Sequence, residues 1–206
     1  GDFEHFMLKE IHEQPATLRT CMQGRVDPIN GTITLGGVSE LSDSLVNTKR
    51  VVLLGQGTAF HAAMIGKYLL ESLSGVATEV EYASEFRYRN PIVEEGTVAI
   101  AVSQSGETAD TLAAVQEAKR RGATTLGVVN VVGSSIARET DAGVYLRVGP
   151  EIGVASTKAF IGQLGVLTML ALYLGRRRHL GREEMISLLT SFEEIPRKIE
   201  SVLAQS

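Results

Sequence analysis

The chain lacks several features that would commit it to a special class of protein. Cys21 is the single cysteine among 206 residues, so the chain forms no internal disulfide and no cysteine-based metal site, and it suits a reducing cytoplasm. The formal net charge is -4, which gives no general attraction to nucleic acid or to anionic lipid. We therefore expect any bound anion to be held locally, by loops and helix ends.

Long apolar runs and targeting signals are also scarce. The longest apolar run, residues 162–174, is interrupted by Gly165 and Thr168 and falls short of the ~20 residues that a membrane span needs. The chain opens at Gly1, without an initiator Met and without the basic-then-apolar pattern of a signal peptide. We expect no membrane span and no leader. The start without Met indicates a piece of a longer protein, although processing explains it equally well.

The middle of the chain alternates between short apolar runs and longer amphipathic stretches. Strand-like runs occupy residues 50–54, 78–82, 97–102, 124–129 and 144–148, and helix-like stretches occupy residues 59–73 and 107–121. Continuous apolar strands joined by helices are typical of a parallel sheet covered on both faces. The pattern therefore predicts an α/β fold with a doubly wound, five-stranded parallel sheet flanked by helices.

The two ends of the chain differ from this middle and read as helical. Residues 6–22 predict a helix in which Pro15 starts a second segment or a kink. Residues 157–204 predict two long helices separated by residues 174–178. Arg176, Arg177 and Arg178 in that separator could form an anion-binding patch, but we favour a basic cluster that complements a helix dipole. We expect an N-terminal helical segment, 1–47, packed on a domain formed by 48–206.

The first candidate site is the loop at residues 103–108, between the most apolar strand and a helix. It holds three hydroxyls, an amide and a glycine at a helix start, where unpaired N–H groups and partial positive charge suit a phosphate dianion. The alternative is helix capping, with Ser105 as the N-cap and Thr108 at the third helical position. Because capping uses one hydroxyl and leaves the others surplus, we favour phosphate binding.

The second candidate loop, residues 55–60, follows the first strand. It has the G-x-G start of a dinucleotide fingerprint, but Phe60 stands where that motif needs a third small residue. Phe60 weakens the nicotinamide interpretation but does not exclude it, because the acidic residues Glu79 and Glu81 do lie downstream. Thr58 could donate to a ligand or cap the helix, and spacing alone does not decide between these roles.

The third candidate loop, residues 149–158, precedes a long helix. Ser156 and Thr157 are natural caps. Lys158 could face an anion, although taken alone it is better explained as a surface lysine in a first helical turn. Ligands of doubly wound sheets bind outside the carboxyl ends of the strands, where the first two loops lie, so we expect those loops to converge on one ligand.

Four segments resemble signatures of glutamine–fructose-6-phosphate aminotransferases. They are residues 5–15, 83–89, 103–111 and 151–160, and the resemblance extends over nearly the whole chain. It implies the first sugar isomerase (SIS) half of that family's isomerase region, with fructose 6-phosphate and glucosamine 6-phosphate as ligands. It also implies a set of contacts for the phosphate and then the sugar: Thr58, Ser103, Gln104, Ser105, Thr108, Val154 and Ser156.

One segment departs from the family pattern. Many members read Cys-Gly-Thr-Ser where this chain has Gln56 to Ala59, so Ala59 lacks a hydroxyl that the family often offers its ligand. The resemblance places the nucleophilic cysteine in a separate glutaminase domain. It places the glutamate base, the ring-opening histidine and the Schiff-base lysine in a second SIS half.

The resemblance therefore implies a segment that binds the substrate but carries no catalytic residue, in an enzyme that needs no metal and no organic cofactor. It also implies a homodimer, with residues 85–89 and the terminal helices as packing segments, and the two other domains of the parent chain as partners. Two alternatives stay open. One is a stand-alone regulatory module that senses sugar phosphates, and the other is a dinucleotide-dependent oxidoreductase, which Phe60 disfavours.

Overall fold

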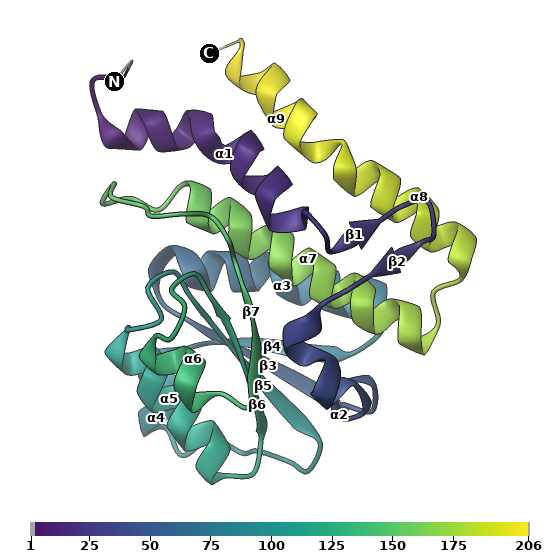
Figure 1. Cartoon of the computed structure of the whole chain (residues 1–206). Helices are drawn as coiled ribbons and strands as arrows, with labels where there is room; N and C mark the ends of the chain where they lie inside the picture. The colour runs from purple at the N-terminus through teal and green to yellow at the C-terminus, as the bar shows by residue number, and fades with distance from the viewer. Residues whose placement is uncertain (1–2, 206) are drawn as a thin grey trace.

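The computed structural model describes residues 3–205, and its centre is a five-stranded parallel sheet (Figure 1). The strand order is β4-β3-β5-β6-β7. The strands are β3 (Arg50–Gly55), β4 (Ala77–Tyr82), β5 (Thr97–Ser103), β6 (Thr124–Val129) and β7 (Ala142–Tyr145). Each pair in the order is parallel, which confirms the predicted fold class.

Helices cover both faces of the sheet. α3 (Gly57–Ser74) and α7 (Lys158–Arg178) lie on one face, and α4 (Ala83–Tyr88), α5 (Ala109–Arg120) and α6 (Ser135–Glu139) lie on the other (Figure 1). The side chains of β3 alternate between these layers. Val51 and Leu53 join the core under α3 and α7, whereas Val52 and Leu54 pack with Phe86 of α4. Every residue of β5 is buried, because this central strand has a helical layer on each side.

α7 is the central helix of its layer. It is long and apolar enough to cross a membrane by length and composition, yet 78% of its most apolar window is buried inside the fold. Glycines let it approach α3 closely. A Cβ on Gly66 would lie 2.8 Å from a methyl of Leu167, and one on Gly175 would lie 2.1 Å from the carbonyl oxygen of Leu73. α7 is therefore a core helix of this domain.

The predicted break at residues 174–178 is wrong. α7 continues through these residues and ends where the N–H groups of His179 and Leu180 both bond to the Gly175 carbonyl at 2.8 Å. Two further helices follow, α8 (Arg182–Glu193) and α9 (Ile195–Leu203). They are separate because Pro196, in the first turn of α9, has no N–H to continue the α8 ladder.

The arginines at the end of α7 serve the helix end. Arg176 bonds to the Leu180 carbonyl at 3.1 Å, and Arg178 bonds to the Val46 carbonyl at 2.7 Å. Arg177 lies 3.6 Å above the centre of the Tyr173 ring. These contacts with carbonyls and a ring favour the structural interpretation of the cluster over an anion-binding patch.

The N-terminal segment packs along the α7 side of the domain. α1 (Phe6–Met22) runs through Pro15 as one helix, so no second segment starts there, and it contacts α7 and α9. Arg19 forms a 2.7 Å ion pair with Glu200 of α9. Cys21 is fully buried, and burial raises the pKa of its thiol to about 11, which leaves it unreactive. The predicted division into residues 1–47 and 48–206 includes residues 1, 2 and 206, which lie outside the described residues.

Short elements connect α1 to the sheet, and sequence periodicity predicts none of them. β1 (Val26–Asp27) and β2 (Thr32–Ile33) form an antiparallel pair. The 3-10 helix η1 (Gly36–Leu41) then packs against β7 and leads into α2 (Ser42–Val46). Gly37 allows this approach, because a Cβ there would lie 2.1 Å from the Gly143 carbonyl oxygen.

Candidate functional site

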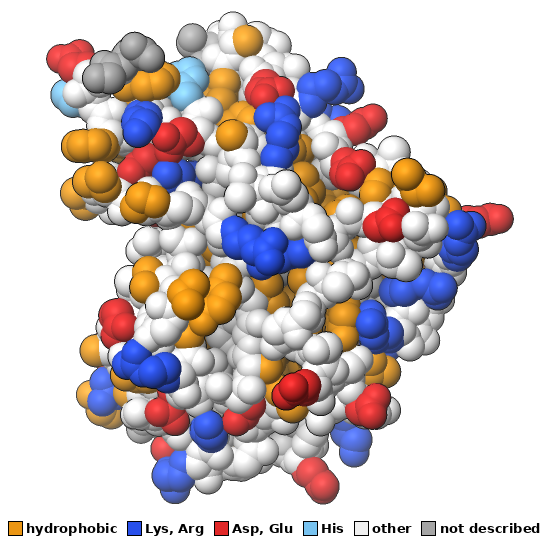
Figure 2. All heavy atoms as spheres, in the orientation of Figure 1, with side chains coloured by type: hydrophobic (Ala, Val, Ile, Leu, Met, Phe, Trp, Pro, Cys, Tyr) orange, Lys and Arg blue, Asp and Glu red, His pale blue; other side chains and the backbone are white. Residues whose placement is uncertain are grey.

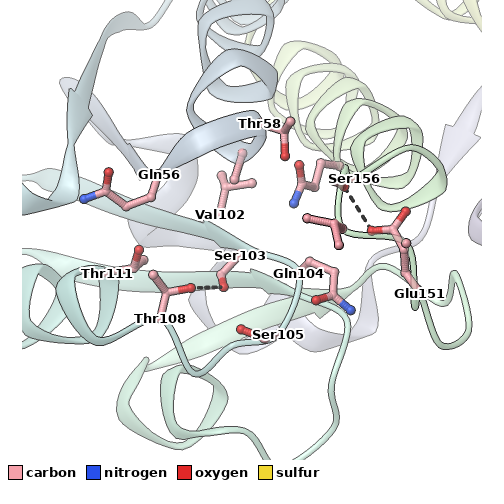
Figure 3. A pocket seen from close by; sticks show the side chains of 14 residues that line it. Gln56, Thr58, Val102, Ser103, Gln104, Ser105, Thr108, Thr111, Glu151 and Ser156 are labelled. Atoms are coloured by element: carbon pink, nitrogen blue, oxygen red, sulfur yellow. Dashed lines mark hydrogen bonds between the residues drawn. The ribbon is translucent and has the colours of Figure 1, made fainter. Parts of the chain in front are cut away.

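A pocket of about 220 Å³ lies at the carboxyl ends of β3 and β5, where three loops meet (Figure 3). It is lined by all seven residues for which the family resemblance implies ligand contacts: Thr58, Ser103, Gln104, Ser105, Thr108, Val154 and Ser156. The first two loops follow β3 and β5, and the third precedes α7. The first two loops therefore meet at one pocket, where the third joins them, and their binding of one ligand stays a prediction.

Internal hydrogen bonds shape the loop between β5 and α5. Ser103 Oγ accepts from the Gly106 N–H at 3.1 Å, and Ser105 Oγ accepts from the Glu107 N–H at 3.1 Å. Gly106 has a φ of +68°, and a Cβ there would lie 2.0 Å from Ser134 Oγ. Only glycine suits this position, and it lets the loop fold tightly enough to present its hydroxyls to the pocket.

The start of α5 differs from the capping alternative. The N-cap is Thr108, not Ser105, and its side chain forms no capping hydrogen bond. The helix begins at Ala109, two residues later than the periodicity predicts. The first-turn N–H groups of α5 are thus left without a side-chain acceptor at the N-cap, and such groups attract anions.

The start of α3 has the same character. Its N-cap is Gln56, which forms no side-chain capping bond, and Thr58 lies in the first turn with an exposed side chain. Thr58 is therefore not the cap of this helix. Two uncapped helix starts, α3 and α5, contribute residues to one pocket, and each brings partial positive charge without a cationic side chain.

The start of α7 is already occupied by a carboxylate. Glu151 accepts from the N–H groups of Thr157 and Ala159 at 2.9 and 3.1 Å and from Ser156 Oγ at 3.0 Å (Figure 3). Thr157 is the N-cap residue, but the acceptor at this helix start is Glu151. Glu151 is not among the residues predicted from the sequence, although an acidic residue shortly before a helix start is a recognisable signal.

Lys158 is neither a surface lysine nor a pocket residue. Its side chain is buried, and Nζ lies 2.7 Å from Glu13 Oε2 on α1. The hydrogen bond from Lys158 is the main cause that lowers the pKa of Glu13. Our preference for a surface lysine in the first turn is therefore wrong, because α1 covers this part of α7.

Two polar atoms at the pocket wall have no partner in the described part of the protein. Thr111 Oγ1 and Gln163 Oε1 are buried and form no hydrogen bond there, and both residues line the pocket. Neither residue is among the predicted contacts, since each occupies an ordinary helical position in the sequence pattern. An unpaired buried acceptor is costly, so these atoms favour a polar ligand in the pocket.

The chemistry of the lining favours binding over catalysis. The remaining lining residues are Gln56, Ala59, Val102 and Gly153. Glu151 is the one ionisable side chain among the described lining residues, and its oxygens are engaged at α7. Within residues 3–205 no group of three or more His, Cys, Asp or Glu side chains is placed to hold a metal. Hydroxyls, amides and helix starts can hold an anion that also carries hydroxyl groups.

The acidic residues of the dinucleotide alternative are engaged elsewhere. Glu79 forms a 2.5 Å ion pair with Arg50, and Glu81 forms a bidentate pair with Arg89. The Phe60 ring stacks on Tyr82, with 3.7 Å between their centres. These contacts leave no free carboxylate at either position to bind a ribose, which further disfavours this alternative.

The chain is similar to one family model and to curated enzymes of a single name. Residues 44–173 match the family model described as SIS domain. Over 206 residues the chain is 52% identical to the glutamine–fructose-6-phosphate aminotransferase (isomerizing) of Chlorobaculum tepidum, covering 100% of this chain and 34% of that protein. It is 51% identical over 204 residues to the enzyme of the same name from Bacteroides thetaiotaomicron, covering 98% and 33%. The chain thus spans about a third of the length of these curated relatives.

Two solved structures superpose on this chain over most of its length. The C-terminal domain of glucosamine-fructose-6-phosphate aminotransferase from Francisella tularensis superposes with a TM-score of 0.90 and 34% identity, covering 95% of this chain and 55% of that one. Glucosamine-6-phosphate deaminase from Thermotoga maritima superposes with a TM-score of 0.69 at 24% identity, covering 92% and 54%. The second likeness concerns the fold alone.

Proposed function

The chain belongs to the SIS domain family, and from that premise we propose that its pocket binds a sugar phosphate. The proposed ligands are fructose 6-phosphate and glucosamine 6-phosphate. The observation that carries the proposal is the meeting of two uncapped helix starts with a cluster of hydroxyl and amide side chains in one pocket. A phosphate dianion suits the helix starts, and the hydroxyls of a sugar suit the amides and the unpaired acceptors.

In this proposal the loop after β5 binds the phosphate. Ser103, Gln104, Ser105 and Thr108 supply side-chain donors, and Thr58 lies at the neighbouring helix start. Val154 and Ser156 on the third loop contact the sugar. The absence of Lys and Arg from the described lining makes this a site of neutral donors, in which partial charges of the backbone offset the phosphate charge.

We further propose that the chain is the first SIS half of a glutamine–fructose-6-phosphate aminotransferase. In the reaction proposed for the parent, ammonia from glutamine condenses with the ketose carbonyl, and a proton then moves between adjacent carbons. The described lining offers no histidine and no lysine, and its one carboxylate is engaged. The proton-transfer and Schiff-base groups would therefore come from a second SIS half, and the ammonia from a glutaminase domain. By itself the chain would bind the ligand without turnover.

A homodimer in the cytoplasm completes the proposal. Apolar side chains gather at the start of α1, where Phe6, Met7 and Leu8 are 58%, 45% and 43% exposed (Figure 2). On α4, within the expected packing segment, Tyr88 is 76% exposed. Exposed apolar clusters of this kind mark contacts with other polypeptide.

We also propose that residues 1–47 form a helical segment packed on a domain of residues 48–206.

A sugar-phosphate sensor remains a second candidate, because a pocket with binding groups and no free acid or base would also serve a regulatory module. The sequence on either side of this segment distinguishes the two, since an aminotransferase requires the two further domains.

Isothermal titration of the purified chain tests the shared step. We expect binding of fructose 6-phosphate and glucosamine 6-phosphate in preference to NAD, and no conversion of either sugar. Tight binding of NAD without sugar-phosphate binding would overturn the proposal. Turnover by chain free of contaminating enzyme would contradict the assignment of catalysis to other domains.

A further inference from the structure

A buried carboxylate from α1 is bonded to the backbone of the third pocket loop. Glu10 is only 3% exposed. Its Oε1 accepts from the Ile152 N–H at 2.6 Å, and its Oε2 accepts from the Gly153 N–H at 3.1 Å. Every hydrogen bond that the structure gives this carboxylate goes to these two neighbouring N–H groups, and Gly153 itself lines the pocket.

The loop is fitted closely around this carboxylate. A Cβ on Gly153 would lie 2.6 Å from Glu10 Oε2, so a larger residue at that position would push the carboxylate away. One turn along α1, Glu13 pairs with Lys158 at the start of α7. α1 is therefore joined to the loop at residues 152–153 and again where the loop enters α7.

These bonds tie the loop to a distant segment, in addition to the bonds that Glu151 forms within the loop itself. Charged acceptors form shorter and stronger hydrogen bonds to N–H groups than neutral ones, and a buried carboxylate without such donors is costly. Val154 directly follows the two bonded residues, and Ser156 comes two residues later. Any shift of Ile152 and Gly153 would therefore move the two loop residues assigned to the sugar.

We propose that Glu10 is a positioning residue of the pocket: its carboxylate holds the Ile152–Gly153 backbone and thereby sets Val154 and Ser156 for the sugar. The identity of the ligand rests on the proposed function, whereas the positioning itself is a property of the unliganded chain. The pocket is then built from four segments instead of three, and the fourth lies more than 140 positions away in sequence, with 142 between Glu10 and Ile152.

α1 does not depend on Glu10 for its attachment to the domain. Leu18, Cys21 and Met22 are buried in the main core. Arg19 pairs with Glu200 of α9, on exposed side chains far along the helix from Glu10. A change at Glu10 should therefore act on the loop, while a change at Arg19 should act on the helix contact alone. This contrast provides a matched control.

The test compares Glu10→Gln with Arg19→Gln in two measurements. Hydrogen exchange of the unliganded chain follows the Ile152 and Gly153 amides, and isothermal titration measures affinity for fructose 6-phosphate. In Glu10→Gln one acceptor oxygen becomes an NH₂ group that cannot accept from an N–H. We expect exchange at these two amides to accelerate and affinity to fall, each by about tenfold. Arg19→Gln should leave both unchanged.

The alternative outcomes separate the two proposals. A lower melting temperature for Glu10→Gln with unchanged affinity and unchanged loop exchange would make Glu10 a merely structural residue and overturn the inference. If Glu10→Gln fails to fold, Gly153→Ala is used, which displaces the carboxylate from the loop side and should give the same two changes. If the unmodified chain binds no sugar phosphate, the proposed function fails, and the exchange measurement alone decides the positioning role.

Discussion

Ser103 Oγ and Thr108 Oγ1 lie 3.1 Å apart across the loop between β5 and α5. Ser103 is the last residue of β5, and Thr108 is the N-cap of α5. The Thr108 hydroxyl thus bonds to another hydroxyl and not to the backbone of the helix it precedes. One hydroxyl donates to the other, and the hydroxyl that accepts keeps its own hydrogen to donate to a ligand, so the pair is suited to binding a phosphate.

We predict that Thr108→Val weakens sugar-phosphate binding about tenfold to a hundredfold, because a hydrogen bond to a charged group contributes roughly 1.5–3 kcal/mol. The fold should be little affected, since Thr108 makes no capping bond. Ser105→Ala should also weaken binding, with some loss of stability because Ser105 Oγ accepts from the Glu107 N–H. Titration and thermal unfolding of each variant measure the two effects. A control is Thr190→Val on α8, which should leave affinity unchanged. A drop in melting temperature with full affinity would move the phosphate site elsewhere.

Gln163→Met separates ligand binding from stability in another way. Gln163 is 1% exposed, and its Oε1 has no partner among the described residues. Replacing this unpaired acceptor with an apolar group of similar length should leave the free energy of unfolding equal or higher. Affinity for fructose 6-phosphate should fall, because the sugar loses an acceptor. Urea unfolding and titration test the pair of effects, and a variant that loses stability while keeping affinity would show that Gln163 serves the core.

Ala59→Ser should strengthen binding. Ala59 lines the pocket at the start of α3, and a serine there restores the hydroxyl that the resembled family often carries. One added neutral hydrogen bond contributes about 0.5–1.5 kcal/mol, which corresponds to a gain of roughly two- to tenfold in affinity. Titration with fructose 6-phosphate measures the gain, with Ala62→Ser, a buried position on the same helix, as the control that gains nothing. Equal affinity for Ala59→Ser and the unmodified chain would place the sugar away from this helix start.

The pair formed by Glu13 and Lys158 should make stability depend on acid pH. The hydrogen bond from Lys158 lowers the pKa of Glu13 below its usual value of 4.5. Because the folded-state pKa is depressed, the stabilisation is fully present above about pH 4.5 and is lost as the pH falls through the folded-state pKa. Glu13→Gln should be less stable than the unmodified chain near neutral pH, by on the order of 1 kcal/mol.

This difference in the free energy of unfolding should shrink below pH 4.5, and urea unfolding at a series of pH values measures it. Lys9→Gln is the control and should change the free energy of unfolding less, because Lys9 contacts the same carboxylate at 3.5 Å but is half exposed. A difference that stays constant across this range would mean that the ion pair does not contribute.

Gly175→Ala should destabilise the fold without touching the pocket. A Cβ at this position would lie 2.1 Å from the Leu73 carbonyl oxygen, at the contact between α3 and α7. Because backbone cannot yield as a side chain can, we expect a loss of about 1–3 kcal/mol. Gly36→Ala is the matched control, since Gly36 is exposed, its φ lies outside the left-handed region, and nothing lies within 4 Å of its added Cβ. Thermal unfolding compares the two, and equal melting temperatures would show that the helices can separate at little cost.

The sheet could be predicted because local sequence determines its strands. Runs such as 97–102 are apolar on both faces, which only a covered parallel sheet tolerates. The last strand is the exception, since residues 144–148 are predicted and β7 is Ala142–Tyr145. Arg147 has a φ of +59°, which ends the extended backbone, and a side chain pattern does not reveal such a backbone angle.

In the candidate site, too, some features follow from local sequence and others from contacts between distant segments. Hydroxyls beside glycine at strand ends are a local signal that predicts the loops after β3 and β5. The seven contact residues come from the family resemblance, and all seven line the pocket. Contacts between distant segments determine the surroundings of three other residues: Glu10, Lys158 and Gln163. No local pattern could therefore distinguish them from ordinary helix residues. The break between α8 and α9 could be predicted only in part. Pro196 is a local signal for it, but the apolar periodicity continues from one helix into the next and hides the break.

The link between α1 and the third loop also bears on how the protein is made. Glu10 leaves the ribosome 142 residues before Ile152. At the usual rate of synthesis this interval is on the order of 10 s. Throughout that time the carboxylate has no loop to bind, while all five strands of the sheet are being made. The pocket can therefore be completed only after all five strands of the sheet have been made, and a product cut short before Ile152 would lack the third loop of the pocket.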